Sequence, residues 1–171
     1  ITASSAWKSF GSQCKRNEII AKKCKPIQDF SNKPVNVNSP FHHGHKYEPL
    51  SVMLYERENK TIIEDFGCLE HEKIPYLAAS PDGINVDPTS KLYGRLLEIK
   101  NPVSRKITGI PKKDYWVQMQ MQMACTGLYT CDFLETFFVA YENEEEFKAD
   151  GTYNKTSEGK QKGIIVGFWK E

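Results

Sequence analysis

The five residues 96–100, LLEIK, place a carboxylate and an ammonium group inside an otherwise apolar run that is typical of a β-strand. Residues two apart in a strand project to the same face, so Glu98 and Lys100 are expected to lie side by side. Asp82, with fifteen residues between it and Glu98, ends an earlier strand-like run. We therefore expect neighbouring strands to bring two carboxylates and a lysine into one cleft.

This pattern suits a divalent-metal site that hydrolyses phosphodiesters. Mg²⁺ prefers oxygen ligands and retains several waters, so Asp82, Glu98 and the backbone carbonyl of Ile99 are sufficient to hold it. Lys100 would then hold the attacking water or stabilise the charge that develops on the phosphate. The alternative is that Asp82 sits in an ordinary turn and that Glu98 and Lys100 form a surface ion pair. The order and proximity of the motifs within an apolar strand favour the metal site.

Length and composition indicate one folded domain inside a cell. A chain of 171 residues with 39% hydrophobic residues is long enough to bury a core of its own. No apolar run approaches the roughly 20 residues of a membrane span, and no signal peptide is recognisable, so we expect a protein that is not secreted. The five cysteines form no CxxC pair, which disfavours disulfides and zinc or iron–sulfur sites and predicts reduced, mostly buried thiols. Because the sequence begins at Ile1 rather than Met, we expect a piece upstream of it.

Basic residues are concentrated near the N-terminus. Residues 1–48 contain eight lysines and arginines against three acids, a net charge of +5, whereas the whole chain carries +1. Such a segment can meet a polyanion, although a solvated helix surface explains it equally well. The nearby His42, His43 and His45 lack the spacing of a zinc site, and we favour surface or DNA-facing positions for them.

Hydrophobic periodicity and the positions of glycine and proline predict an α/β (α+β) fold, with a central mixed β-sheet flanked by helices. Helices are expected over residues 2–10, 15–25, 44–58 and 114–128. Strands are expected over residues 62–69, 76–80, 83–86, 95–100, 132–141 and 163–169. Loops are expected over residues 31–41, 103–113 and 142–162, the last of them long and solvated.

Two of the expected helices carry polar candidates for the site. Glu48 is a third acid on the helix 44–58, although by itself it is an ordinary helical glutamate. The alternating Gln and Met residues over 118–123 have the period of a strand, but both residue types favour helices and the run is long. In a helix, Tyr115, Gln118 and Gln122 share one face. A glutamine can orient a water or bind a phosphate oxygen, although most helical glutamines do neither.

The motifs together resemble one nuclease family. They occur in the order Gly44-x-x-x-Glu48, Ser80-Pro81-Asp82-Gly83, Leu97-Glu98-Ile99-Lys100 and Tyr115-x-x-Gln118-x-Gln120. This set resembles the lambda-exonuclease branch of the PD-(D/E)XK nucleases, and most of all the YqaJ-type viral recombinase nucleases of large DNA viruses. The resemblance extends over about residues 1–140 and includes the opening Ile1-Thr2-Ala3-Ser4.

The resemblance implies a restriction-endonuclease-like PD-(D/E)XK core in a single nuclease domain over residues 1–171. Within it we expect a basic helical segment over 1–43, a catalytic core over 44–141, and an acidic loop with a final strand over 142–171. The implied activity is that of an exonuclease that uses Mg²⁺ or Mn²⁺, with two ions, and degrades linear duplex DNA from the 5′ end. It would act in recombination, repair or viral genome processing, in the cytoplasm or nucleus of a host cell. A strand-annealing protein is an implied partner, and the family includes both toroidal trimers and monomers, so a homo-oligomer is an open alternative.

The resemblance also implies roles for individual residues. The expected metal ligands are Asp82, Glu98 and the carbonyl of Ile99, with Glu48 as an outer ligand or water-positioning acid. Lys100 is the expected catalytic lysine, and Gln118 is expected to contact the water or a phosphate. The residues expected to bind DNA phosphates are Ser4, Ser80 and Gln120, with the two serines at the terminal 5′-phosphate. The upstream Trp and Arg that hold the DNA end in the family have no counterpart in this sequence.

Other functions stay open at this point. An endonuclease or a single-strand nuclease of the same superfamily would carry the same motifs. A catalytically silent DNA-binding recombination scaffold is disfavoured, because decayed sites usually lose one of Asp82, Glu98 and Lys100. The basic N-terminal segment argues only mildly against an enzyme that acts on a phosphodiester outside nucleic acids.

Overall fold

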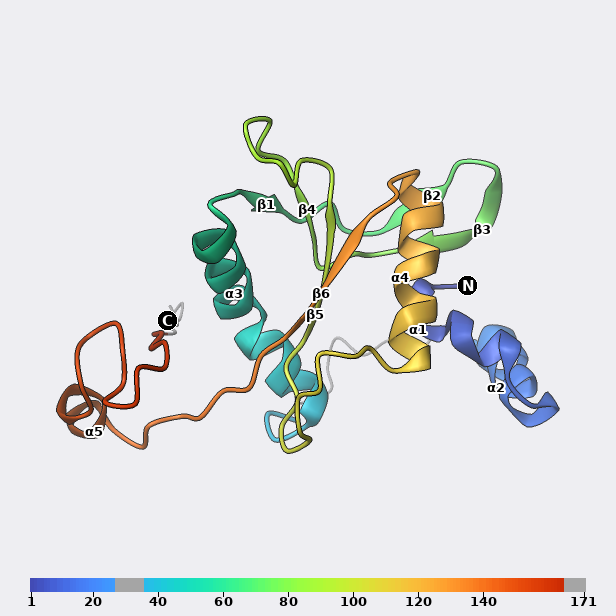
Figure 1. Cartoon of the computed structure of the whole chain (residues 1–171). Helices are drawn as coiled ribbons and strands as arrows, with labels where there is room; N and C mark the ends of the chain where they lie inside the picture. The colour runs from blue at the N-terminus through green and yellow to red at the C-terminus, as the bar shows by residue number, and fades with distance from the viewer. Residues whose placement is uncertain (27–35, 165–171) are drawn as a thin grey trace, which may run out of the picture.

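A mixed four-stranded sheet with helices on both faces forms the centre of the molecule, as the computed structural model shows (Figure 1). The structure describes residues 1–26 and 36–164. The helices are α1 (Ala3–Ala6), the 3₁₀ helix η1 (Trp7–Phe10), α2 (Gln13–Cys24), α3 (Pro40–Asn59), α4 (Lys113–Thr126) and α5 (Glu144–Ala149). The strands are β1 (Ile63–Glu64), β2 (Leu69–His71), β3 (Ile74–Ala79), β4 (Gly83–Asn85), β5 (Leu96–Lys100) and β6 (Cys131–Glu135). The predicted fold class is confirmed.

The sheet order is β1-β4-β5-β6, with β5 parallel to β6 and antiparallel to β4. Strands β2 and β3 form a separate antiparallel pair. Helix α3 lies on one face of the main sheet and α4 on the other, with α1 beside α4 (Figure 1). None of the described helices is both long and apolar enough to cross a lipid bilayer.

Strand β5 is at the centre of this arrangement because its side chains are buried on both faces. Leu97 and Ile99 pack with Tyr55 of α3 in one apolar cluster. The alternate residues Glu98 and Lys100 project to the opposite face, towards α4, as the two-residue period of a strand requires. The predicted placement of Glu98 beside Lys100 is confirmed.

Helix α3 begins earlier than predicted. Ser39 caps it by accepting a hydrogen bond from His42 N at 3.1 Å, and Pro40 occupies the first turn, where proline is well tolerated. The predicted start at Gly44 is therefore wrong, and Pro49 lies in the helix interior. Helix α4 agrees with the prediction and ends at Gly127, whose φ of 70° suits a helix C-cap.

Several predicted strands are shorter or divided. The run 62–69 splits between β1 and β2, with Gly67 at φ 64° between them. Strand β6 stops at Glu135 instead of reaching residue 141, because its partner β5 ends at Lys100, just before Pro102. The predicted loop 142–162 contains α5, which Asn143 caps. Of the predicted strand 163–169, only Gly163 and Ile164 lie within the described residues, and neither is in a strand.

The thiols differ from the prediction in exposure. All five cysteines are free, as expected, but Cys14, Cys24 and Cys68 are exposed. Two of these lie on α2, which has no buried residues. The prediction of mostly buried thiols is wrong, because the basic helix packs on so little of the molecule.

Candidate active site

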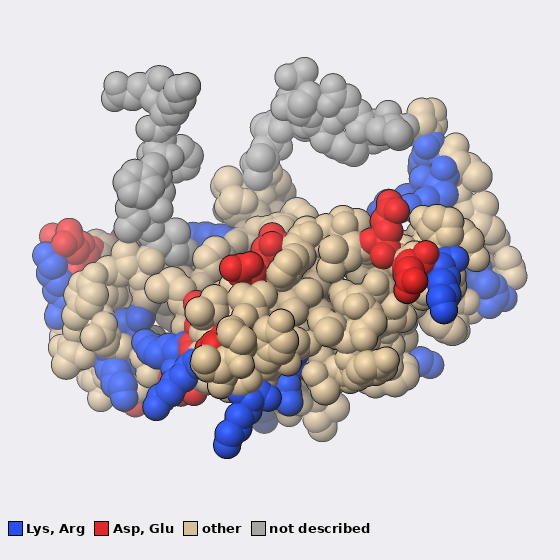
Figure 2. Space-filling view, turned by 90° about the horizontal axis from the view of Figure 1, so that it is seen from above, with Lys and Arg blue, Asp and Glu red and all other residues tan. Residues whose placement is uncertain are grey.

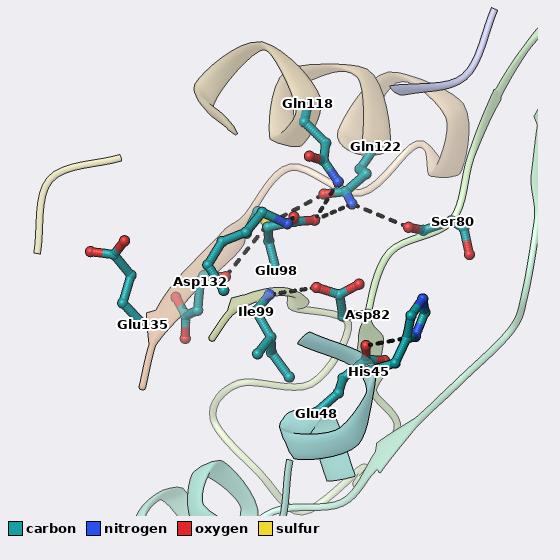
Figure 3. A network of polar contacts seen from close by, with 12 residues as sticks. His45, Glu48, Ser80, Asp82, Glu98, Ile99, Gln118, Gln122, Asp132 and Glu135 are labelled. Carbon is teal, nitrogen blue, oxygen red and sulfur yellow. Dashed lines mark hydrogen bonds and ion pairs between the residues drawn. The ribbon is translucent and has the colours of Figure 1, made fainter. Parts of the chain in front are cut away.

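Glu98 is the most enclosed acidic group of the predicted site. Its side chain has no exposed surface and accepts hydrogen bonds at both carboxylate oxygens. Lys100 Nζ donates to Oε1, while Gln118 Nε2 and Gln122 Nε2 donate to Oε2 at 3.0 and 2.6 Å. Figure 3 shows the two glutamines pointing from α4 towards Glu98. A buried carboxylate with this many donors is fixed in one orientation.

Asp82 approaches the same strand from the other side. It lies between β3 and β4, and its backbone N–H donates to Leu97 O at 3.1 Å. Its Oδ2 accepts a hydrogen bond from Ile99 N at 2.6 Å. Figure 3 shows Asp82 between the Ile99 backbone and the turn of α3 that carries His45 and Glu48. Strand pairing therefore places both predicted acids next to Ile99, with Glu98 preceding it on β5 and Asp82 bonded to its backbone N–H.

Burial raises the pKa values of the two acids of the site, and one lysine only partly offsets this effect. Burial, followed by the charge of Asp82, raises the pKa of Glu98 to about 7. Burial is also the main cause that raises the pKa of Asp82. Burial alone would lower the pKa of Lys100, but the charges of Glu98 and Asp82 outweigh it and raise that pKa. One lysine is thus shared by two carboxyl groups that burial makes reluctant to ionise.

A cleft of about 380 Å³ opens beside this group. Glu48, Asp82, Ile99 and Lys100 all line it, as predicted for a common site. Burial, and then the charge of Asp82, raises the pKa of Glu48. A larger hollow of about 1960 Å³ lies between α3 and residues 135–164, and none of the predicted site residues lines it.

The donors around the cleft are chemically suited to a hard cation, although they are not assembled into a finished metal cluster. Across residues 1–26 and 36–164, no group of three or more His, Cys, Asp or Glu side chains converges as metal ligands would. Asp82, Glu98 and Glu48 nevertheless offer oxygen atoms, which Mg²⁺ and Mn²⁺ prefer. A cation beside Asp82 would also relieve the repulsion that raises the pKa of Glu98. The residues present therefore fit a divalent metal ion.

Five of the predicted residues do not line the cleft: Glu98 and Gln118, which contact each other, and the three exposed residues Gln120, Ser4 and Ser80. Gln120 is exposed, because it is two residues from Gln118 on α4 and therefore faces away from Glu98. Ser4 and Ser80 are also exposed and do not line the cleft, although the Ser80 carbonyl accepts a hydrogen bond from Gln122 Nε2 at 3.4 Å. The structure therefore brings Gln118, but not these three residues, into contact with the buried acid.

Other residues at the site have no role predicted from the sequence, although Tyr115 and Gln122 are expected to share a helix face with Gln118. Gln122 is fully buried and contacts Glu98, a position indicated by its four-residue spacing from Gln118. Arg105 and Tyr115 line the cleft, and Lys100 Nζ lies 5.2 Å from the centre of the Tyr115 ring. His45 Nδ1 is 3.7 Å from Glu48 Oε2, so this histidine faces an acid of the cleft. The contacts of Arg105 depend on long-range pairing that no local sequence pattern reports.

Replacing Gln122 with leucine is expected to destabilise the protein by about 1–3 kcal/mol, because the change removes a donor from a buried carboxylate. Chemical denaturation measures the effect. The matched control is Gln120→Leu on the same helix, where an exposed change is expected to stay within about 0.5 kcal/mol. Equal stability of the two variants would show that the Gln122 contact contributes nothing.

Comparisons with known proteins agree with this geometry. The family model described as the YqaJ-like viral recombinase domain matches residues 1–129. An uncharacterised protein of Acanthamoeba polyphaga mimivirus is 39% identical over 129 residues, which are 68% of this chain and 24% of that protein. The chain thus spans about a quarter of the length of this relative.

Two solved structures are also similar to this fold. Both are of LHK-Exo, an alkaline exonuclease from Laribacter hongkongensis, and one of them is a complex with dAMP. They are 29% and 30% identical to this chain, with TM-scores of 0.60 and 0.61. The matches cover 79% and 80% of this chain and 68% and 69% of the solved chains. The mixed sheet with its flanking helices is therefore a PD-(D/E)XK-type core.

Proposed function

We propose, because this chain belongs to the YqaJ-like viral recombinase family, that it is a divalent-metal-dependent deoxyribonuclease that degrades linear duplex DNA from an end. The observation that carries the proposal is the convergence of Asp82, Glu98 and Lys100 around residue 99, where Asp82 and Lys100 line the cleft and Glu98 is buried in contact with Lys100. The match to the YqaJ-like viral recombinase domain and the similarity to the LHK-Exo structures support a nuclease that acts in viral recombination or genome processing.

The proposed metal is Mg²⁺ or Mn²⁺, held by Asp82, Glu98 and the Ile99 carbonyl. Glu48 would be an outer ligand, and the proposed number of ions is two. The oxygen donors of these residues match the preference of both metals. When bound, the metal would supply Lewis acidity to the phosphate and lower the pKa of a water. The raised pKa values of Asp82 and Glu98 support this arrangement, because burial disfavours their ionised forms and the two carboxyl groups share a single lysine, Lys100.

The residues of the chain would orient the reactants around that position. Lys100 is placed to stabilise negative charge on the scissile phosphate, since its ammonium group lines the cleft and contacts Glu98. Gln118 and Gln122 would keep the Glu98 carboxylate in one orientation. Glu48, across the cleft on α3, would position the attacking water.

Positive charge around the cleft would bind the DNA backbone. Arg105 lines the cleft and forms an ion pair with Glu135, which leaves further guanidinium N–H groups for phosphate oxygens. Acidic and basic side chains are interspersed on the face seen from above, without a continuous basic stripe (Figure 2). The net charge of +5 over residues 1–48 would add to the attraction for the DNA backbone.

The direction of degradation along the DNA and the assembly of the protein are also proposed. We propose 5′→3′ degradation, with Ser4, Ser80 and Gln120 as contacts of the DNA strand rather than of the buried acid. Their exposure is compatible with that role. A strand-annealing recombination protein is the proposed partner, and self-association into a homo-oligomer is proposed as the route to retaining the DNA.

Digestion of linear and covalently closed circular duplexes of the same sequence tests the proposed activity. With Mg²⁺, the linear duplex is expected to be degraded to nucleotides and the circle to be spared. Labels at the 5′ or 3′ end of the linear duplex report the polarity. Cleavage of the circle at a comparable rate would favour an endonuclease, and no cleavage of either substrate would favour a silent DNA-binding scaffold.

A further inference from the structure

A buried cluster of three polar side chains joins α3 to the ends of β5 and β6. Ser51 of α3 is fully buried, and its Oγ lies 2.8 Å from Asn101 Oδ1 and 2.6 Å from Thr136 Oγ1. Thr136 Oγ1 lies 2.6 Å from the same Asn101 Oδ1. Asn101 directly follows Lys100, and Thr136 N donates to Lys100 O at 3.1 Å. The cluster therefore adjoins Lys100, the lysine that lines the cleft.

The hydroxyl protons of Ser51 and Thr136 determine which way the Asn101 amide group is oriented. Each hydroxyl has one proton to donate, and the amide oxygen of Asn101 can accept two hydrogen bonds. Thr136 donates to Asn101 Oδ1, and Ser51 donates either to the same oxygen or to Thr136 Oγ1. The Asn101 amide must then present its Nδ2 group on the other side, where it donates to Gly44 O at 3.1 Å. Two hydroxyl groups thereby select the orientation of one amide.

The bond to Gly44 is made where α3 lacks a backbone hydrogen bond because of Pro49. Gly44 lies one turn before Glu48, so its carbonyl is the one towards which the Glu48 N–H points in an α-helix. Pro49 has no N–H, so it cannot donate to the carbonyl of His45. The turn that carries Glu48 therefore lacks the helical hydrogen bond to His45 O, and Asn101 adds a bond at the neighbouring carbonyl, Gly44 O.

We infer that Asn101, oriented by Ser51 and Thr136, is a positioning residue that sets Glu48 of α3 against Asp82 and Lys100 across the cleft. The inference rests on the proposed function, because it gives Glu48 a part in holding the metal or its water. Asn101 also lines the cleft, but its amide group is bonded to Gly44 O and to the two hydroxyl groups. It acts through the backbone of residues 44–48.

Calorimetric titration of the chain with Mn²⁺ alone tests the inference without any turnover. Asn101→Ala is expected to weaken Mn²⁺ binding by about tenfold, as changes behind a metal ligand do. The matched control is Asn59→Ala, which removes the same kind of bond from Asn59 Nδ2 to an α3 carbonyl, Tyr55 O, at 2.9 Å. Because Asn59 lies at the far end of α3, its loss is expected to leave Mn²⁺ affinity unchanged. Thermal unfolding of both variants without metal reports any general loss of structure.

A double-mutant cycle identifies the route of the effect. If Asn101 acts through Glu48, Asn101→Ala is expected to have no further effect on Mn²⁺ affinity in a Glu48→Gln background. Independent, additive losses would overturn the inference, as would an Asn101→Ala variant that binds Mn²⁺ like the wild type. Failure of the wild-type protein to bind Mn²⁺ at all would instead contradict the proposed function on which the inference rests.

Discussion

Replacing Lys100 with methionine is expected to lower the rate of DNA hydrolysis by about a thousandfold, which is typical for removal of a group that stabilises transition-state charge. The ammonium group contacts Glu98, lies near Asp82 and lines the cleft, so no other described lysine can take its place there. Methionine keeps an unbranched apolar stem beside Tyr115. Single-turnover digestion of linear duplex DNA with saturating Mg²⁺ measures the rate.

The control for this change is Lys113→Met, at the exposed first residue of α4. It removes the same charge from the chain and is expected to keep the wild-type rate of hydrolysis. Circular dichroism and thermal unfolding in the presence of Mg²⁺ establish that both variants are folded. A folded Lys100→Met variant that retains more than a tenth of the wild-type rate would contradict the catalytic role of this lysine.

Replacing Glu98 with glutamine is expected to separate activity from stability. DNA hydrolysis should be lost, because a central oxygen ligand is removed. The metal-free protein should nevertheless gain about 1–3 kcal/mol of stability at pH 8, because a fully buried carboxylate no longer has to ionise. The loss of the ion pair with Lys100 reduces this gain without cancelling it, since Lys100 retains Asp82 as a neighbouring carboxylate.

The pH dependence of this gain follows from the direction of the pKa shift. Glu98 ionises near 4.5 in the unfolded chain and near 7 in the folded protein. Between these values the folded protein holds a proton that the unfolded chain has lost, so ionisation removes stability as the pH rises. The stability difference between Glu98→Gln and the wild type should therefore grow from about pH 4.5 to 7 and level off above it. Denaturation in a chelating buffer measures it, with exposed Glu70→Gln as the control.

A Glu98→Gln variant that is less stable than the wild type at pH 8 would contradict this account. Such a result would mean that the hydrogen bonds and the ion pair to Glu98 outweigh the cost of burying its charge. Loss of stability in Glu70→Gln as well would point instead to a general effect of removing acids.

The core of the site could be predicted from the sequence because its constraints are local. The period of a strand places Glu98 beside Lys100, and the four-residue spacing on α4 places Gln118 and Gln122 on one face. The prediction of a helix over the alternating Gln and Met residues is correct, because helix propensity and length outweigh the alternation. The mixed sheet then followed from the order of these elements.

Features that depend on contacts between distant residues could not be predicted in this way. Strand β6 ends where its partner β5 ends, although residues 136–141 are as strand-like as those before them. Gln120 was assigned with Gln118 by motif, but the geometry of a helix turns it to the surface. The bond from Asn101 to Gly44 joins residues 57 positions apart. The division at residues 43 and 141 remains a prediction.

The central claim is that Asp82, Glu98 and Lys100 form a metal-dependent nuclease centre. The most direct measurement is the release of nucleotides from end-labelled linear duplex DNA by the wild type and by Asp82→Asn, each in Mg²⁺ and in a chelator. Asparagine can still accept the hydrogen bond from Ile99 N, so the variant should fold. The account predicts release only by the wild type in Mg²⁺. Intact DNA in every reaction, or equal release by the variant, would contradict it.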